Sequence, residues 1–244
     1  MTCRKALVTG GTRGIGFAVA EALLKAGYEV TVTGSKPNGK GPKGSAIITC
    51  NFLNREATQK FADEIKNKNF DILINNAGIN KIGPIADYNP EDFEKIQQVN
   101  LIAPFLLCQA VIPGMCRRRF GRIVNVTSVF GVVSRAGRHA YSASKFGLFG
   151  LSRALSLEVA KDNVLVNCLA PGFIDTDLSR EILGEKGVAQ VIQKIPMGRL
   201  GEPKEMAKVI QFLVSGENTY LTGQNIIVDG GYNCGWKEDE DSIA

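Results

Sequence analysis

The 244-residue chain is predicted to form one α/β domain, a doubly wound seven-stranded parallel sheet with helices on both faces. Two observations predict this fold class. Apolar runs of strand length alternate with longer segments of helical periodicity, and each run is apolar at nearly every position, as in strands covered on both faces. Right-handed crossovers between such parallel strands then give a doubly wound arrangement. We expect no internal repeat and no second domain.

The amino-terminal half accounts for the first four strands. Gly14–Gly27 has the pattern of an amphipathic helix that ends on glycine. Gly34–Gly44 holds four glycines and two prolines in eleven residues, so we expect a loop there in place of a crossover helix. The other elements expected in this half are strands at Lys5–Thr9, Tyr28–Thr33, Ser45–Cys50 and Asp71–Ile74, and a helix at Asn54–Asn67.

The carboxyl-terminal half supplies three more strands and the longest helices. Pro90–Arg118 is expected to form one or two helices, with Pro113 ending or kinking the last turns. Short helical patterns interrupted by glycine and proline predict a mobile substrate lid over about residues 177–200. The charged tail, residues 237–244, is expected to be a solvated end. The remaining expected elements are a helix at Ala140–Ala160 and strands at Arg122–Val126, Val164–Leu169 and Asn225–Val228.

The composition is that of an ordinary soluble protein. Apolar residues make up 44% of the chain and charged residues 22%. No apolar run is expected to reach membrane-spanning length, and the first strand begins too near Met1 to leave room for a signal peptide. We therefore expect a cytoplasmic protein. The mild net charge of +5 suits an anionic ligand and does not indicate nucleic acid.

Cysteine and histidine usage argues against a metal site. The six cysteines form no C-x-x-C pair, and His139 is the single histidine. Most of the cysteines fall in apolar runs, so we expect them to fill the core as free thiols. We expect His139 to be a loop residue at the rim of a substrate pocket, because it stands two residues before Tyr141.

A glycine-rich turn, Thr9–Gly16 (TGGTRGIG), joins the first strand to the first helix. Glycine lets the main chain turn tightly and approach a pyrophosphate, while the helix N-terminus presents free amide groups and the positive end of its dipole. A turn after a strand and before a helix is the setting in which this pattern binds a dinucleotide.

The end of the second strand indicates which dinucleotide is bound. Dehydrogenases that select NAD place a carboxylate there, whereas this chain has Thr33–Lys36 (TGSK). Arg13, Ser35 and Lys36 offer two cations and a hydroxyl, which suit a 2′-phosphate. We therefore expect NADP(H).

Tyr141 and Lys145 stand four residues apart in the run YSASK, so on a helix their side chains share one face. Free tyrosine has a pKa near ~10, and a neighbouring cation favours the phenolate. A tuned proton donor beside a nicotinamide cofactor indicates carbonyl reduction or its reverse.

Taken together, these motifs resemble the short-chain dehydrogenase/reductase family over nearly the whole chain and in the family's order. The shared features are the glycine-rich turn, Asn75–Gly78 (NNAG), Asn100, Ser128, the Tyr141–Lys145 run, and Pro171-Gly172 followed by Thr176. Within the family, the similarity is greatest to 3-oxoacyl-acyl-carrier-protein reductases, through Gly121–Ser128 (GRIVNVTS), Ala170–Asp177 (APGFIDTD) and Pro196–Pro203 (PMGRLGEP). The resemblance implies a Rossmann fold that binds NADP(H).

The resemblance also implies a catalytic tetrad. Tyr141 would protonate the ketone oxygen, and Lys145 would lower the pKa of the tyrosine and hold the nicotinamide ribose. Ser128 would hydrogen-bond the same oxygen and stabilise developing charge. Asn100 would hold a water molecule through its main chain. Taken singly, each residue has an ordinary structural alternative, such as a turn hydroxyl or a solvated lysine.

The cofactor contacts follow from the same resemblance. The turn at Asn76–Gly78 would pass the adenosine ribose, Asn51 and Phe52 would contact the adenine, and Ile174 and Thr176 would contact the nicotinamide amide. The full set of expected cofactor-binding residues is Gly10, Thr12, Arg13, Gly14, Ile15, Gly16, Ser35, Lys36, Asn51, Phe52, Asn76, Ala77, Gly78, Tyr141, Lys145, Pro171, Gly172, Ile174 and Thr176.

The implied activity is NADPH-dependent reduction of a 3-oxoacyl thioester to the 3-hydroxyacyl product. Two alternatives remain: a reductase or dehydrogenase of another ketone, sugar or polyol, and a protein that binds NADP(H) without catalysis. The resemblance also implies a homotetramer, with one interface through the helices at Asn100–Arg118 and Tyr141–Ala160 and another through the C-terminal strand region. The lid contains apolar residues that suit an aliphatic substrate or ordinary packing, namely Leu178, Ile182, Leu183, Val188 and Val191.

A substrate carried on acyl carrier protein would call for basic side chains near the pocket mouth. Arg117, Arg118, Arg119 and Arg122 are the candidates, although a solvated helix end explains a cluster of cations equally well. Leu157 stands where close relatives often carry a basic residue, which weakens the assignment to a protein carrier.

Overall fold

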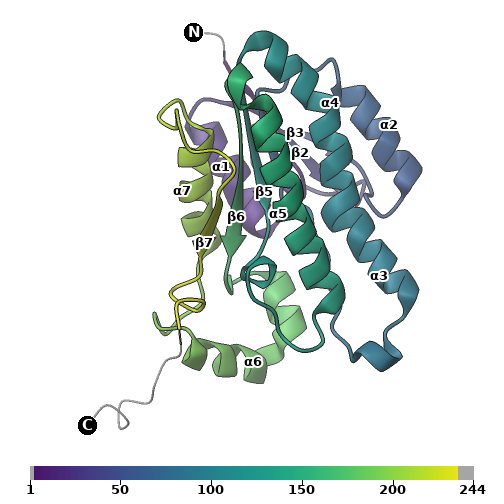
Figure 1. The fold of residues 1–244 in the computed structure, drawn as a ribbon, viewed down its shortest axis with the longest axis vertical. Helices are drawn as coiled ribbons and strands as arrows, with labels where there is room; N and C mark the ends of the chain where they lie inside the picture. Colours follow the sequence, from purple (N-terminus) through teal and green to yellow (C-terminus); the bar gives the residue numbers. More distant parts are fainter. Residues whose placement is uncertain (1–2, 236–244) are drawn as a thin grey trace.

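The computed structural model describes residues 3–235, which form a seven-stranded parallel sheet flanked by helices (Figure 1). The strand order is β3-β2-β1-β4-β5-β6-β7. From β1 the chain first adds β2 and β3 on one side and then β4 to β7 on the other. The predicted fold class is confirmed, whereas the charged tail lies outside the described residues. The strands are β1 (Lys5–Val8), β2 (Glu29–Gly34), β3 (Ala46–Thr49), β4 (Ile72–Asn75), β5 (Gly121–Val126), β6 (Val164–Pro171) and β7 (Asn225–Val228).

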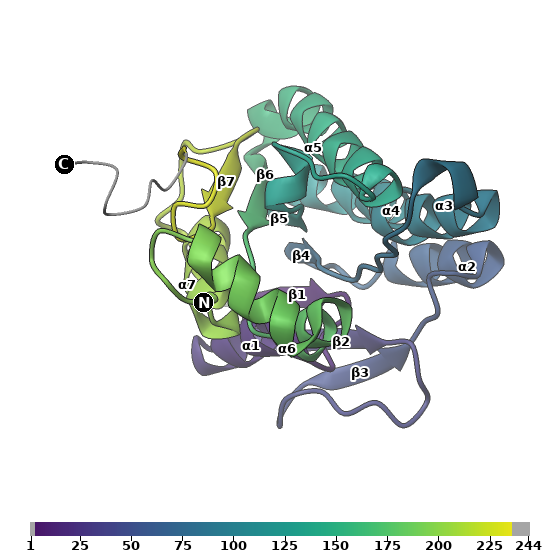
Figure 2. The same cartoon turned by 90° about the horizontal axis from the view of Figure 1, so that it is seen from below.

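Helices cover both faces of the sheet (Figure 2). On one face α1 (Gly14–Lys25) and α7 (Pro203–Val214) enclose one cluster of buried apolar side chains. On the other face α2 (Arg55–Ile65), α4 (Ala103–Arg118) and α5 (His139–Val159) enclose a second cluster. The sheet therefore lies between two apolar cores, which explains why its strands are apolar at nearly every position.

The paired strands β1 and β4 mark the point at which the strand order reverses. Val8 of β1 lies opposite Val32 of β2 on one side and Ile74 of β4 on the other. The connections that leave β1 and β4 depart to opposite faces, so ligands of such sheets bind beyond the carboxyl ends of these strands.

The sequence analysis did not predict α7. The carboxylate of Glu205 accepts a hydrogen bond from the Glu202 amide at 2.7 Å, which caps the helix start. Met206, Ile210 and Leu213 are buried against the sheet at helical spacing. The capping residues and the apolar spacing were both present in the sequence.

Residues Pro90–Arg118 form a continuous helical segment with three parts. It comprises α3 (Pro90–Gln97), a π-helical segment (Gln98–Ile102) and α4, which passes through Pro113 and does not end there. By length and composition this segment qualifies as a membrane span, contrary to expectation, but 56% of its most apolar window is buried inside the protein. It packs against α2 and α5, as a core helix does.

The predicted lid is α6 (Asp177–Lys194), which lies across the carboxyl ends of the strands (Figure 2). Gly184 interrupts it with a φ of 64°, a conformation that residues with a β-carbon rarely adopt. Val191 packs with Phe130 and Phe173 in a small apolar cluster beneath the helix. Short 3₁₀ turns occur at Ile85–Asp87, Val129–Gly131 and Ala160–Asp162.

The loop prediction is confirmed, and the cysteine prediction in part, because all six cysteines are free thiols but Cys3 and Cys234 are exposed and Cys116 is only partly buried. Gly34–Gly44 contains no helix beyond the end of β2. Cys50, Cys108 and Cys168 are buried free thiols, and burial raises the pKa of Cys168 to about 12. A thiol held in its neutral form is a weak nucleophile, so these residues act as core fillers.

Candidate active site

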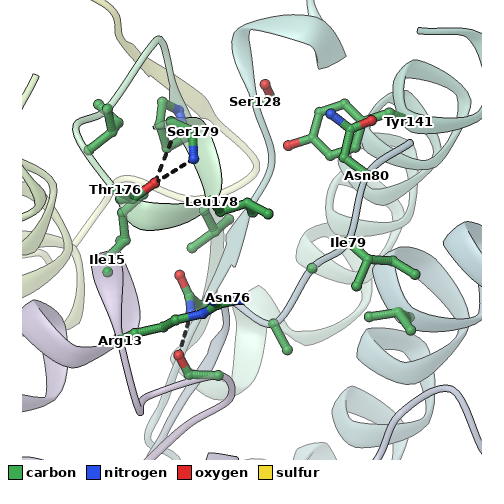
Figure 3. A pocket seen from close by; sticks show the side chains of 18 of the residues that line it. Arg13, Ile15, Asn76, Ile79, Asn80, Ser128, Tyr141, Thr176, Leu178 and Ser179 are labelled. Carbon is green, nitrogen blue, oxygen red and sulfur yellow. Dashed lines mark hydrogen bonds between the residues drawn. The ribbon is translucent and has the colours of Figure 1, made fainter. Parts of the chain in front are cut away.

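A cavity of about 390 Å³ opens at the carboxyl ends of the strands, below α6 (Figure 3). The glycine-rich turn and the ends of β4, β5 and β6 form its floor, and α5 and α6 contribute its walls. Most of the predicted cofactor residues line it, together with Ser128. Those that line it are Gly10, Thr12, Arg13, Gly14, Ile15, Ser35, Asn51, Phe52, Asn76, Ala77, Gly78, Tyr141, Lys145, Pro171, Gly172, Ile174 and Thr176.

The glycine-rich turn has the geometry that a pyrophosphate requires. Gly10 has a φ of 64°, and a β-carbon on Gly16 would lie 2.4 Å from the carbonyl oxygen of Gly10. Gly16 therefore does not line the cavity but allows the helix to approach the turn. No side chain caps the start of α1 and no acidic residue stands in its first turn, so its free amide groups suit an anion.

Thr9 and Asn76 fix this turn to the end of β4. The hydroxyl of Thr9 accepts hydrogen bonds from the amides of Asn76 at 2.9 Å and Ala77 at 3.0 Å. In return, the side-chain amide of Asn76 donates to the carbonyl oxygens of Thr9 at 2.9 Å and Gly10 at 3.2 Å. The two loops that flank the cavity are thus held at a fixed separation.

The adenosine end of the cavity is formed by the end of β2. The amide of Gly10 donates to the Thr33 hydroxyl at 3.1 Å, and Ser35 and Arg13 line the cavity beyond it. Lys36 is exposed and does not line the cavity, so its expected contact is not supported by this structure. Arg13 and Ser35 remain as the groups that suit a 2′-phosphate.

Lys145 is buried beneath the cavity in the second turn of α5. Its Nζ atom donates a hydrogen bond to the main-chain oxygen of Val126 at 2.8 Å and lies 5.5 Å from the ring centre of Tyr141. Burial lowers the pKa of Lys145 to about 8. A proton on this amine is therefore held less tightly than on a solvated lysine.

Tyr141 and Ser128 face the same part of the cavity (Figure 3). Burial raises the pKa of Tyr141, while a hydrogen bond with Ser128 and the positive charge of Arg138 oppose that rise. Arg138 is thus a cation that acts on this pKa and that the sequence did not suggest, while the part of Lys145 in lowering it stays a prediction. The tyrosine hydroxyl is protonated at neutral pH, as a proton donor must be.

Asn100 lies behind the cavity in the π-helical segment and is fully buried. Its side-chain oxygen accepts from the Ile79 amide at 2.9 Å, and its nitrogen donates to the Ile79 oxygen at 2.9 Å and to the Ser144 hydroxyl at 3.1 Å. The side chain therefore fixes the segment after β4 to α5. Any part in a proton relay is left to its main chain, as the resemblance implies.

Two polar residues that line the cavity, Asn80 and Arg138, were missed in the sequence. The side-chain oxygen of Asn80 is buried and has no hydrogen-bond partner within residues 3–235. Arg138, at the N-cap of α5, is a buried cation. A cation at the positive end of a helix dipole is unfavourable, and this placement was a readable signal of another role.

His139 is not the pocket-rim loop residue that the sequence suggested. It is the first residue of α5, and its ring packs edge-on against Tyr88 with 4.3 Å between ring centres. It lines neither of the two cavities described for residues 3–235. Its position before Tyr141 turns it away, because neighbouring helical residues face different directions.

The arginine cluster lies at the amino end of β5, at the opposite edge of the sheet from the cavity. Arg118 forms an ion pair with Asp71 at 3.2 Å, and Arg119 pairs with Asp162 at 3.4 Å. Arg122 is buried and donates to the main-chain oxygens of Gly121, Asn163 and Asn218. Within one chain these three arginines bind neighbouring segments near the amino ends of β4, β5 and β6 and do not line the cavity.

Comparisons with known proteins agree with this site. A family model described as enoyl-(acyl carrier protein) reductase matches residues 10–233. The 3-oxoacyl-(acyl-carrier-protein) reductase FabG of Aquifex aeolicus is 41% identical over 238 residues, which cover 92% of this chain and 95% of the relative.

Two solved structures share the fold closely. The 3-oxoacyl (acyl-carrier-protein) reductase of Agrobacterium tumefaciens C58 with NADP bound has a TM-score of 0.88 at 32% identity, covering 94% of both chains. The aldohexose dehydrogenase of Thermoplasma acidophilum has a TM-score of 0.90 at 29% identity, covering 97% of this chain and 96% of the other. From its family match, its relatives and its site, the chain belongs to the short-chain dehydrogenase/reductase family.

Proposed function

We propose that the protein reduces a 3-oxoacyl thioester to the 3-hydroxyacyl thioester with NADPH. The observation that carries the proposal is the placement of the Tyr141 and Ser128 hydroxyls in the cavity that the glycine-rich turn opens. The match to 3-oxoacyl-(acyl-carrier-protein) reductases and the NADP in one neighbouring structure support the same activity and cofactor.

The residues present fit NADP(H). The glycine-rich turn and the start of α1 would hold the pyrophosphate, Arg13 and Ser35 the 2′-phosphate, and Lys145 the nicotinamide ribose. The cofactor supplies the hydride when bound. A β-carbon on Gly14 would lie 3.3 Å from the methyl group of Thr176. A residue larger than glycine would therefore fit tightly at this position.

The chain's own residues would provide the proton and the oxyanion contact. Tyr141 would donate its hydroxyl proton to the ketone oxygen, and Ser128 would hold that oxygen by a second hydrogen bond. Lys145, beneath the tyrosine, would stabilise the phenolate as the proton leaves. Asn100 would keep the adjoining loop and helix in register through its contacts with Ile79 and Ser144.

The wall of the cavity opposite Tyr141 favours an acyl chain. Leu178, Ile182 and Leu183 of α6 line it, whereas Val188 and Val191 pack in the cluster beneath the helix. An aliphatic chain gains roughly 25 cal/mol for each Å² of apolar surface it buries there. A sugar or polyol, the alternative substrate, would find few polar partners on this wall.

We also propose a cytoplasmic homotetramer. Phe105 on α4 and Phe146 and Leu157 on α5 are exposed, with Leu157 85% accessible. Large apolar side chains on adjacent helices suit an interface between copies of the chain.

The test is the rate of NADPH oxidation with acetoacetyl-coenzyme A, with NADH assayed in parallel. We expect turnover that strongly prefers NADPH. NADPH binding without turnover of the thioester, together with turnover of sugars or simple ketones, would contradict the proposal.

A further inference from the structure

Arg138 is a buried cation without a partner in the described part of the chain. It is 6% exposed and stands at the start of α5, three residues before Tyr141. Its guanidinium packs over the ring of Phe130, with 5.0 Å between its central carbon and the ring centre. Within residues 3–235, its side chain has no hydrogen bond and no ion pair, although ten other ion pairs are present there.

The guanidinium reaches the cavities that it lines, and an anion bound there would compensate its largely buried charge. A buried charge is normally paired, because removal from water is otherwise uncompensated. Burial lowers the pKa of Arg138 from its ordinary value, because the charged form has lost contact with water. The positive end of the α5 dipole, directly after Arg138, also favours a bound anion at this place.

The guanidinium lies between two cavities. It lines the active-site cavity and also a second cavity of about 280 Å³. Ile182 and Leu183 are shared by both cavities, so an acyl chain that leaves Tyr141 along this wall reaches the second one. The lining of the second cavity contains no acidic side chain and is basic at Arg135 and Lys194.

We propose that Arg138 binds a carboxylate at the far end of a short acyl chain, so that the preferred substrate is a 3-oxoacyl thioester with an acidic terminus. This inference rests on the proposed reductase function and specifies its substrate class. The position of Arg138 favours an anion near the reacting ketone, since its charge acts directly on Tyr141. The phosphate of a carrier arm is separated from the thioester by a long chain and is the competing source of an anion.

The test compares two substrates of equal chain length. 3-Oxoadipyl-coenzyme A ends in a carboxylate, and 3-oxohexanoyl-coenzyme A ends in a methyl group at the same carbon. The wild-type protein should prefer the acidic substrate in kcat/KM by roughly 10- to 100-fold, the value of a hydrogen bond between charged groups. Arg138→Gln should abolish that preference, whereas Arg135→Gln, at the exposed rim, should retain most of it.

The ratio of kcat/KM for the two substrates reports recognition of the carboxylate separately from the proton transfer by Tyr141. Loss of Arg138 also raises the pKa of Tyr141, but that change lowers both rates together and leaves their ratio unchanged. NADPH binding and the melting temperature of each variant confirm that the fold is intact. Equal kcat/KM for both thioesters in the wild-type protein would overturn the inference and leave the proposed function standing.

Two further arms separate the remaining outcomes. If Arg138→Gln loses rate equally with both coenzyme A esters but not with their N-acetylcysteamine thioesters, the partner is the arm phosphate and the carboxylate proposal is wrong. If neither thioester is reduced, the proposed function fails, and 4-oxopentanoate against 2-pentanone tests the carboxylate directly. A preference for the acid that Arg138→Gln removes would support it, and equal rates would overturn it.

Discussion

The Nζ atom of Lys145 donates a hydrogen bond to the main-chain oxygen of Val126 at 2.8 Å, which ties α5 to the end of β5 beneath Tyr141. The amine is buried there without a carboxylate partner among the described residues, and burial lowers its pKa to about 8. The contact positions the helix that carries the proton donor, but it also places a charge where charge is unfavourable.

That cost predicts a pH-dependent stability. The unfolded chain binds the lysine proton up to its ordinary pKa of 10.5, whereas the folded protein releases it near 8. The full cost of the buried charge is therefore present below pH 8. The free energy of unfolding rises as the pH increases from 8 to 10.5, because the folded protein loses this proton first. Lys145→Met should be more stable than wild type at pH 7 by about 1–2 kcal/mol, since the lost bond to Val126 offsets part of the gain. Urea unfolding should show this advantage shrinking toward pH 10; an advantage independent of pH would contradict the assignment.

Tyr141→Phe should reduce kcat by about 10²–10⁴-fold, because the general acid is removed while the ring remains. NADPH affinity should change little, since the cofactor turn is at the other end of the cavity. Stopped-flow reduction and fluorescence titration measure the two quantities separately. A variant with a near-normal rate would exclude Tyr141 as the proton donor.

Arg13→Ala should weaken the binding of NADPH by roughly 10- to 100-fold, which is the contribution of a charge-assisted hydrogen bond. The binding of NADH should be weakened much less. Lys36→Ala is the matched control, because Lys36 lies outside the cavity lining and its loss should have a small effect. The ratio of KM for the two cofactors is the measurement. Equal losses for both cofactors in Arg13→Ala would refute its role at the 2′-phosphate.

Asn100→Leu should destabilise the protein by about 2–4 kcal/mol, because it leaves the buried amide and oxygen of Ile79 without partners. Ser144→Ala removes one contact of the same network and should cost about 1 kcal/mol. Urea unfolding of both variants gives the comparison. Similar costs for the two would show that the clamp on Ile79 contributes little.

The strands of the sheet could be predicted from the sequence, because the patterns that indicate them are local. Each strand is a continuous apolar run, and the glycine-rich turn and the Tyr141–Lys145 spacing follow from backbone geometry alone. The length of the α3–α4 segment was also readable, but its continuation through Pro113 was not, because tertiary packing against α2 and α5 decides it.

What the sequence did not reveal depends on contacts between distant segments. The separation of Lys36 from the cavity is set by the path of the Gly34–Gly44 loop, and Arg138 is covered in part by the ring of Phe130 from another segment. The effect of the Arg138 charge on the pKa of Tyr141 likewise depends on three-dimensional charge placement. By contrast, α7 was an omission, since its apolar spacing at Met206, Ile210 and Leu213 was present.

Transfer of the hydride from NADPH to the ketone carbon can be followed directly. NADPH deuterated at both C4 positions is incubated with the protein and acetoacetyl-coenzyme A, and the product is analysed by mass spectrometry. A reductase of 3-oxoacyl thioesters yields a 3-hydroxybutyryl thioester with one deuterium on C3. Oxidation of NADPH that yields no deuterated hydroxyacyl product would contradict this activity.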